Sequence, residues 1–391
     1  MKKIFLFLFL LSASLGLHAT ESKRSNVCLN MIVKNEAHVI CRCLESVKPL
    51  IDSWLIVDTG STDETQDIIR EYLKDIPGEL HERPWVNFAH NRNEALELAR
   101  DKADYLLFMD ADDILTYVPH YIRPETFDKE GYYLKIYYSG TTYDRVQLIS
   151  TQANWRWEGV VHEVIYSPDI KNWGYLDGVV MKIIGGGGRS QDPNKFLKDI
   201  AMLEADLEKD PTNTRSVFYL AQSYRDGNLF DKAIELYEHR VEMGGWDEEI
   251  FWSLYQIACI QERLGRDRET VLAAYSRAFN FRPSRAEPMY RIASYQRQQG
   301  YPYHAYLIAN LGMKIPLPRD LIFVESWIYD FGFAFEHALC CYHLRRYEEC
   351  FNTCLALLSN PKVPDEIKRH IDHLLSVTVQ AINQIRSVQA G

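Results

Sequence analysis

The sequence lacks an excess of positive charge, and no apolar run long enough to span a membrane follows its first twenty residues. There are 44 Lys and Arg against 54 Asp and Glu, which gives a formal net charge of -10. Proteins that bind the phosphate backbone of nucleic acids need a basic face, so this balance argues against a nucleic-acid partner. A chain of 391 residues with 47% hydrophobic and 25% charged residues is typical of a globular protein with two or three domains.

The sequence also lacks the cysteine pattern of a disulfide framework, although it contains eight cysteines. Cys28 lies in an expected strand, Cys41 and Cys43 lie in an expected helix, and positions 340, 341, 350 and 354 fall in a late helical pair. We therefore expect most of them to be small buried hydrophobic side chains. A four-cysteine zinc site in the last group is disfavoured, because the adjacent Cys340 and Cys341 point apart on a helix.

Residues 1–20 have the layout of a secretory signal peptide. Lys2 and Lys3 precede the apolar run 4–11, which is too short to span a bilayer comfortably, and mostly small residues lead to Ala19. We expect an exported protein, periplasmic or secreted. Leu17 is larger than the usual residue at the minus-three position of a cleavage site, so a cytoplasmic or membrane-anchored protein is the alternative.

Strand and helix patterns alternate in the first part of the chain. Apolar runs predict strands at 27–33, 54–57 and 105–109, and a weaker strand is expected at 80–82. Helical spacing between these strands predicts three helices, which contain Ile40, Cys43, Leu44 and Val47, the residues up to Leu73, and Ala95, Leu98 and Ala99. This alternation implies right-handed crossovers and a largely parallel sheet, in which ligands bind at the carboxyl ends of the strands.

Polar clusters follow three of the expected strands: Lys34 to Glu36, then Asp58, then Asp110 with Asp112 and Asp113. Carboxylates crowded at a strand end are costly unless a cation lies there, and their hard oxygens suit Mg2+ or Mn2+. A polar turn is the ordinary explanation for an isolated Asp-x-Asp. Because three clusters converge on one sheet edge, the sequence instead favours a site for a metal and a diphosphate.

Four blocks resemble, in order, the signature of family 2 glycosyltransferases: Leu-Asn-Met-Ile-Val-Lys-Asn-Glu (29–36), Val-Asp-Thr-Gly-Ser-Thr-Asp (57–63), Asn91-Arg92-Asn93 and Met-Asp-Ala-Asp-Asp (109–113). The resemblance spans residues 25–190. It implies an α/β domain of the GT-A fold, a nucleotide-diphosphate sugar donor, a divalent metal (Mn2+ or Mg2+) and inversion at the anomeric carbon. A UDP-sugar is the donor class that it favours.

The resemblance also implies roles for individual residues. The backbone at Met31 to Val33 would contact the nucleobase, with Asp58 at the base or ribose and Arg92 close by. Asp110 would face the ribose or sugar, and Asp112 would ligate the metal. Glu36, in the first block, belongs to the same expected donor site. The alternatives are a polar helix start for Glu36, a turn before a helix for Asp58 and a surface charge for Arg92.

Strands are expected at 132–138 and 146–150, and the segment that follows, Asn154 to Glu163, resembles a tryptophan-rich acceptor loop ending in Val-His-Glu. The resemblance implies that His162 completes the metal site and that Glu163 or Glu158 deprotonates the acceptor hydroxyl. The Glu-Asp pair common in this region of the family is absent, which leaves the base undecided. A structural histidine, a salt-bridged Glu163, and core packing of Trp155 and Trp157 are the alternatives.

Four glycines, Gly185 to Gly188, follow an expected strand at 179–184. They let the backbone pass close to a ligand, and Arg189 with Ser190 would meet the diphosphate. A flexible joint between domains is the alternative.

From Asn194 onward only helical periodicity remains. Alanines at 221, 258, 293 and 338 recur with offsets of 37, 35 and 45 residues, and a glycine near the turn accompanies the first three. This pattern resembles tetratricopeptide-like helix pairs, whose concave surfaces bind peptides or proteins. The fourth copy has Arg345 in place of the glycine, and an insertion around 315–329 lengthens the last spacing.

We therefore expect a signal peptide at 1–20, a GT-A domain at 25–190 and a helical repeat domain at 194–391. The leading hypothesis is a metal-dependent inverting glycosyltransferase whose repeats recruit or position a protein or glycan acceptor. The alternative is an exported helical-repeat scaffold with an inactive transferase-like domain. The missing Glu-Asp pair motivates that alternative, as does export away from the cytoplasmic supply of nucleotide sugars.

Overall fold

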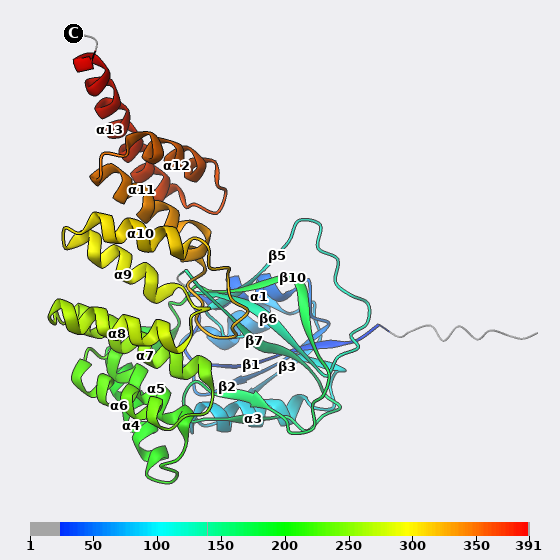
Figure 1. Ribbon diagram of the computed structural model, residues 1–391. Helices are drawn as coiled ribbons and strands as arrows, with labels where there is room; N and C mark the ends of the chain where they lie inside the picture. Colours follow the sequence, from blue (N-terminus) through cyan, green and yellow to red (C-terminus); the bar gives the residue numbers. More distant parts are fainter. Residues whose placement is uncertain (1–23, 139, 390–391) are drawn as a thin grey trace, which may run out of the picture.

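The computed structural model describes residues 24–138 and 140–389, so the expected signal peptide lies outside the described residues. Figure 1 shows a sheet domain beside a column of stacked helices, and the column ends in a long C-terminal helix. In the described part of the chain, no helix combines the length and the apolar character that a bilayer crossing requires.

An eight-stranded sheet in the order β3-β2-β1-β4-β7-β6-β10-β5 forms the first domain. Its strands are β1 (Val27–Val33), β2 (Ser53–Asp58), β3 (Gly78–Glu82), β4 (Tyr105–Phe108), β5 (Asp113–Tyr117), β6 (Gly131–Tyr138), β7 (Thr141–Ser150) and β10 (Trp173–Ile183). The first four strands in this order are parallel, whereas β7 is antiparallel to both neighbours and β5 is antiparallel to β10. The α/β class with a mostly parallel, GT-A-like sheet is confirmed.

Three helices cover the parallel part of the sheet: α1 (Ile40–Val47), α2 (Thr65–Tyr72) and α3 (Phe88–Ala99). Helix α1 buries Ile40, Cys43, Leu44 and Val47, the residues that its spacing predicts. They pack with Leu29 and Met31 on one face of β1, whereas Ala95 and Ala99 of α3 pack with Cys28 on the other face. Because side chains alternate along a strand, β1 contributes to two hydrophobic layers.

A small ribbon, β8 (Arg156–Glu158) with β9 (Val164–Tyr166), carries the Val-His-Glu segment at its tip. Val161 in this tip is buried with Phe218 in the core of the helical domain. The side chain of Arg215 donates a hydrogen bond of 2.8 Å to the carbonyl oxygen of His162. The tip of the ribbon is therefore held by the helices.

The second domain is all helical. It contains η1 (Gly188–Gln191), α4 (Lys195–Leu207), α5 (Thr214–Asp226), α6 (Phe230–Glu242), α7 (Asp247–Arg263), α8 (Arg268–Phe281), α9 (Glu287–Gln298), α10 (Pro302–Gly312), η2 (Ile328–Gly332), α11 (Phe333–His343), α12 (Tyr347–Ser359) and α13 (Asp365–Gln389). The four alanines that define the repeats are all fully buried, one each on α5, α7, α9 and α11. The expectation of tetratricopeptide-like helix pairs is confirmed.

The turn inside each helix pair adopts the same left-handed conformation. It falls on Asn228, Gly265, Gly300 and Arg345, with φ values of 60°, 64°, 84° and 60°. The first copy therefore uses Asn228, the residue that directly follows Gly227, as its left-handed position. Asparagine tolerates this conformation better than most residues, whereas Arg345 adopts it at a steric cost.

The insertion between the third and fourth pairs forms a strap, residues 314–327, that reaches the sheet domain. Val324 and Thr142 of β7 exchange two backbone hydrogen bonds, of 2.8 and 2.9 Å. Arg285, which is fully buried, pairs with Glu287 and with Asp320 of the strap. The strap thus joins the helical column to the β6–β7 hairpin.

The cysteines behave largely as expected. Six are buried, at positions 28, 43, 340, 341, 350 and 354, Cys259 is partly buried and Cys41 is exposed. All eight are free thiols.

Candidate active site

A cleft of ≈ 1860 Å³ lies between the sheet domain and the helices. One wall contains the acidic cluster after β4, the glycine segment and the tip of the β8–β9 ribbon. The other wall contains residues of α4, α5, α7 and the strap. The carboxyl ends of β1 and β4 therefore face the helical repeats across one enclosed volume.

The glycine segment packs against two carboxylates of this cleft. The amide of Gly187 donates to Oδ2 of Asp112 at 3.0 Å, and the amide of Gly188 donates to Glu36 at 3.2 Å. A Cβ atom on Gly187 would lie 2.9 Å from Asp112 Oδ2 and 3.0 Å from Glu36 Oε2. Only glycine fits this position without a shift of the carboxylates, which explains part of the glycine run.

Asp110 is held by two arginines. Its Oδ1 lies 2.5 Å from Nη2 of Arg92, and its Oδ2 lies 3.7 Å from Nη2 of Arg145. Burial by itself would raise the pKa of Asp110, but Arg92 and Arg145 outweigh it and hold that pKa below its ordinary value. Asp110 is therefore a permanent negative charge at the end of β4.

Two neighbouring carboxyl groups are compensated less than Asp110 is. Burial raises the pKa of Glu36 to about 7. The hydrogen bond from the amide of Gly188 opposes this rise, and the charge of Asp112 adds to it. Burial and the nearby Asp110 raise the pKa of Asp113 to about 8. Glu36 and Asp113 therefore ionise reluctantly beside Asp110 and Asp112, and a bound cation would favour their charged forms.

The donor set fits a divalent metal in its chemistry. Asp112 and Asp110 supply hard oxygens at the edge of the cleft, and Glu36 adds a third carboxylate beside Asp112. The hydrogen bond from Gly187 engages only Oδ2 of Asp112. Asp112 would be the principal ligand for Mn2+ or Mg2+, since Asp110 is engaged by Arg92.

His162 is not brought to this cluster. Its ring stacks on Tyr219 of α5, with centroids 4.3 Å apart, and its backbone has a φ of 54°. Among the described residues, the ligand atoms of Asp110, Asp112 and His162 do not form a group within 4.8 Å of one another. The predicted three-ligand set is therefore not assembled, because contacts with the helical domain fix the histidine.

Arg92 is a buried bridge. Its Nε lies 2.5 Å from Oε1 of Glu163, its Nη2 binds Asp110, and its guanidinium lies 5.0 Å from the ring centroid of Trp157. Arg92 lines the cleft, but its charge is already paired with the carboxylates of Asp110 and Glu163. The sequence-based alternative of a surface charge is wrong.

The two candidate bases occupy different environments. Glu163 lines the cleft. Glu158 is exposed on β8, where it pairs with Arg156 at 2.6 Å, and it does not line the cleft. Alternation along the strand turns Trp157 inward and Glu158 outward, so the structure does not bring Glu158 to the cleft.

The expected nucleobase site is only partly exposed. Val33 and Thr59 line the cleft, whereas the side chain of Met31 is buried in the sheet core and cannot reach a ligand. Asp58 is fully buried, and its Oδ1 accepts hydrogen bonds from the amides of Gly60 and Ser61 at 2.8 and 2.7 Å. Its Oδ2 is buried without a partner.

Arg189 lines the cleft beside the glycine segment. Its guanidinium pairs with Asp199 of α4 and lies 4.6 Å from the ring centroid of Phe88. It therefore ties η1 to α4, and a diphosphate would have to compete with Asp199 for it.

The sequence analysis missed several residues of the cleft. Arg145 precedes the strand expected at 146–150 and carried no local signal, yet it faces both Asp110 and Asp113. The aromatic residues Trp252 on α7 and Phe323 on the strap lie in the opposite wall, with ring centroids 4.9 Å apart. Only the tertiary fold brings them to the acidic cluster.

Comparison with known proteins agrees with this geometry. Residues 28–124 match the family described as glycosyl transferase family 2. The chain carries a family 2 glycosyltransferase domain. This domain is followed by tetratricopeptide-like repeats.

Three relatives illustrate the two parts. The glycosyltransferase SunS of Bacillus subtilis is 26% identical over 234 residues, 56% of this chain and 53% of SunS. An uncharacterized glycosyltransferase of Rickettsia felis is 33% identical over 86 residues, 22% of this chain and 28% of that protein. A TPR repeat-containing protein of Synechococcus elongatus is 38% identical over 92 residues, 23% of this chain and 21% of that protein. The chain spans about half the length of SunS.

Proposed function

We propose that the protein is a metal-dependent inverting glycosyltransferase, which moves a sugar from a nucleoside-diphosphate donor to a hydroxyl group of a protein or glycan. The observation that carries this proposal is the position of Asp110 and Asp112 at the carboxyl end of β4, in a cleft whose opposite wall is the helical domain. Family 2 membership of residues 28–124 supports it.

The donor half of the site is assigned to the sheet edge. Val33 and Thr59 would border the base, and Asp58 would accept a hydrogen bond through Oδ2 once a ligand opens access to that atom. Asp112 would hold the metal, with Asp110 fixed beside it by Arg92. The metal, when bound, offsets the negative charge that collects on the departing diphosphate. A uridine nucleotide is the donor class that we propose.

Glu163 is the base that we assign. Arg92 holds one of its oxygens, and the side chain lies in the cleft. The acceptor oxygen forms a bond to the anomeric carbon while its proton moves to Glu163. The bond from that carbon to the diphosphate oxygen breaks, and the nucleoside diphosphate leaves with the electron pair.

The acceptor half is assigned to the helices and the strap. Tyr219, Trp252 and Phe323 present aromatic surface opposite the acidic cluster, and Arg225 with Gln256 adds hydrogen-bonding groups. A wall of this composition suits a polypeptide segment or a glycan. The repeats would then position the acceptor as part of the active site.

A panel of nucleotide sugars, assayed for released nucleoside diphosphate with Mn2+ and with chelator, tests the proposal. We expect one donor class to react only with metal, and Asp112→Asn to lose the activity while its circular dichroism spectrum stays native. Metal-independent turnover, or full activity of Asp112→Asn, would falsify the metal assignment.

One observation favours a second function, a scaffold with an inactive domain. Both carboxylates predicted as the base are engaged in ion pairs, Glu163 with Arg92 and Glu158 with Arg156. A scaffold would show no turnover with any donor while still binding a partner through the repeats. The same donor panel separates the two functions.

A further inference from the structure

A second group of potential metal ligands lies in the last helix pair, far along the chain from the acidic cluster. His337 and Cys341 are four residues apart on α11, so they share one helix face, and Glu349 lies on α12. His337 and Cys341 are buried, with 5% and 0% exposure, and Glu349 is partly buried. Their ligand atoms all lie within 4.8 Å of one another.

Two of the three separations are close to those of a tetrahedral metal site. The Sγ atom of Cys341 lies 3.7 Å from the ring nitrogens of His337, and Nε2 of His337 lies 3.2 Å from Oε1 of Glu349. Zinc bonds of about 2.3 Å to sulfur and about 2.0–2.2 Å to nitrogen or oxygen place tetrahedral ligand atoms roughly 3.3–3.6 Å apart. The three side chains therefore need little movement to enclose an ion.

Neighbouring side chains orient the carboxylate. The hydroxyl of Tyr306 donates to Oε1 of Glu349 at 2.9 Å, and Nε of Arg346 lies 2.6 Å from Oε2. The guanidinium of Arg346 in turn lies 4.5 Å from the ring centroid of Tyr306. Such outer contacts fix ligand geometry in known metal sites, and Arg346 leaves Glu349 able to bind an ion through one oxygen.

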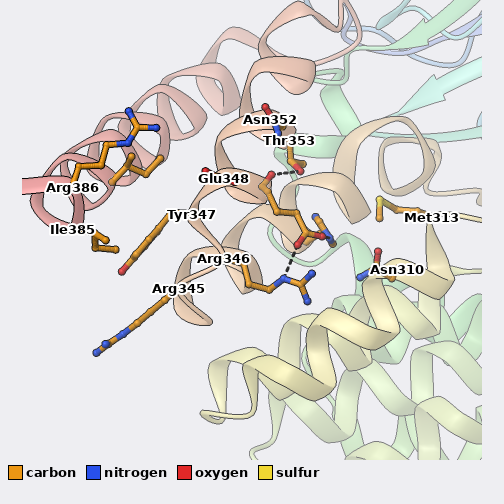
Figure 2. A pocket seen from close by; sticks show the side chains of 13 residues that line it. Asn310, Met313, Arg345, Arg346, Tyr347, Glu348, Asn352, Thr353, Ile385 and Arg386 are labelled. Atoms are coloured by element: carbon orange, nitrogen blue, oxygen red, sulfur yellow. Dashed lines mark hydrogen bonds and ion pairs between the residues drawn. The ribbon is translucent and has the colours of Figure 1, made fainter. Parts of the chain in front are cut away.

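A cavity of ≈ 910 Å³ opens onto the cluster and is lined by His337 and Glu349. Figure 2 shows this cavity, with Arg346, Asn310 and Met313 around it. It provides a path for an ion and room for a water molecule as fourth ligand. A thiolate and an imidazole select zinc over Mg2+ or Mn2+, which prefer oxygen ligands.

We propose that His337, Cys341 and Glu349 bind one zinc ion, with a water from the cavity as fourth ligand, and that this ion links α11 to α12. Binding releases the thiol proton of Cys341 to solvent and creates a sulfur-zinc bond without any change of oxidation state. The link falls in the repeat whose turn holds Arg345 in the left-handed conformation, and the free energy of metal binding would add to the stability of this helix pair. This site is independent of the proposed transferase function.

Metal analysis and cobalt substitution of the full-length protein test the site. We expect one tightly held zinc per chain, and a sulfur-to-cobalt charge-transfer absorption when Co2+ replaces it. Cys341→Ser is expected to lose both signals. Cys340→Ser is the matched control and is expected to keep them, since Cys340 is equally buried but contacts Glu336 instead.

Two further variants keep the result interpretable. Glu349→Gln is expected to lower zinc affinity at least tenfold with all thiols intact, which covers the case in which Cys341→Ser fails to fold. Asp112→Asn is expected to retain the charge-transfer band, because the acidic cluster contains no thiolate. Absence of zinc and of the cobalt band in the wild type would overturn the site, as would an unchanged band in Cys341→Ser.

Discussion

Nε of Arg92 lies 2.5 Å from Oε1 of Glu163, and this contact joins helix α3 of the sheet domain to the tip of the β8–β9 ribbon. The same guanidinium holds Asp110. One buried cation therefore fixes both the acidic cluster at the end of β4 and the carboxylate that we assign as the base. Arg92 therefore contacts a residue of the donor half of the cleft, Asp110, and a residue beside the acceptor half, Glu163.

Removing that cation should destabilise the sheet domain. Arg92→Met leaves Glu163 without its buried partner, and breaking a buried pair from one side costs about 3 kcal/mol or more. We expect the lower end of this range, because Asp110 is partly exposed. Urea unfolding measures the change, and Arg70→Met is the control, since its exposed pair with Asp67 is worth at most about 1 kcal/mol. Equal stability of the two variants would contradict the bridging role.

The two carboxylates predicted as bases should separate kinetically. Glu163→Gln is expected to lower kcat by about 10²–10⁴-fold with little change in donor KM, as the loss of a general base does. Glu158→Gln should leave kcat unchanged, because that side chain is exposed and outside the cleft. Steady-state kinetics with the reacting donor provide the comparison. The reverse pattern would transfer the role to Glu158.

The helical wall should control acceptor binding. Trp246 lines the cleft and is 41% exposed, so Trp246→Ala removes contact surface without opening the core. We expect the acceptor KM to rise roughly tenfold, since losing an aromatic anchor costs about 1–2 kcal/mol. Donor hydrolysis in the absence of acceptor should not change.

Tyr301→Ala is the control for Trp246→Ala. Tyr301 is 43% exposed and does not line the cleft. An equal rise in acceptor KM in both variants would show that the effect does not arise in the cleft.

His162 should make the fold sensitive to acid. The surrounding cleft, with Arg189 and Arg215 nearby, lowers the pKa of His162 below its ordinary value, and the solvent exposure of the side chain limits the size of this shift. As the pH falls below about 6.5, the unfolded chain then binds a proton more readily than the folded chain does, so stability is lost on acidification. Asparagine tolerates the left-handed backbone that His162 adopts. The His162→Asn variant should therefore lose less stability between pH 7 and pH 5 than the wild type does.

Urea midpoints at pH 7 and pH 5 measure this difference. His304→Asn is the control, because His304 lies on α10, outside the cleft. Equal losses of stability by His162→Asn and the wild type on acidification would contradict the role of His162 in acid sensitivity.

Local patterns in the sequence predicted much of the fold. The spacing of Ile40, Leu44 and Val47 predicted the buried face of α1, and the recurring alanines predicted the helix pairs. Both patterns work because each residue's neighbours within one element decide its burial. The acidic cluster was visible for a similar reason, since three carboxylates directly follow a buried strand.

Contacts between distant segments could not be predicted in this way. His162 lies beside Tyr219 because the ribbon tip packs on α5, and Phe323 reaches the cleft because the strap pairs with Thr142. Arg145 acquires its partners only when β7 is placed beside β4. These positions depend on how the two domains pack, which periodicity within a single element does not encode.

Calorimetric titration of the full-length protein with uridine diphosphate, in the presence and absence of Mn2+, is the most direct measurement of the carboxylate site. Binding is expected only with Mn2+, and Asp112→Asn should abolish it while Glu158→Gln leaves it unchanged. Absence of binding by the wild type at about 1 mM ligand, or equal binding by Asp112→Asn, would contradict a metal-diphosphate site at the end of β4.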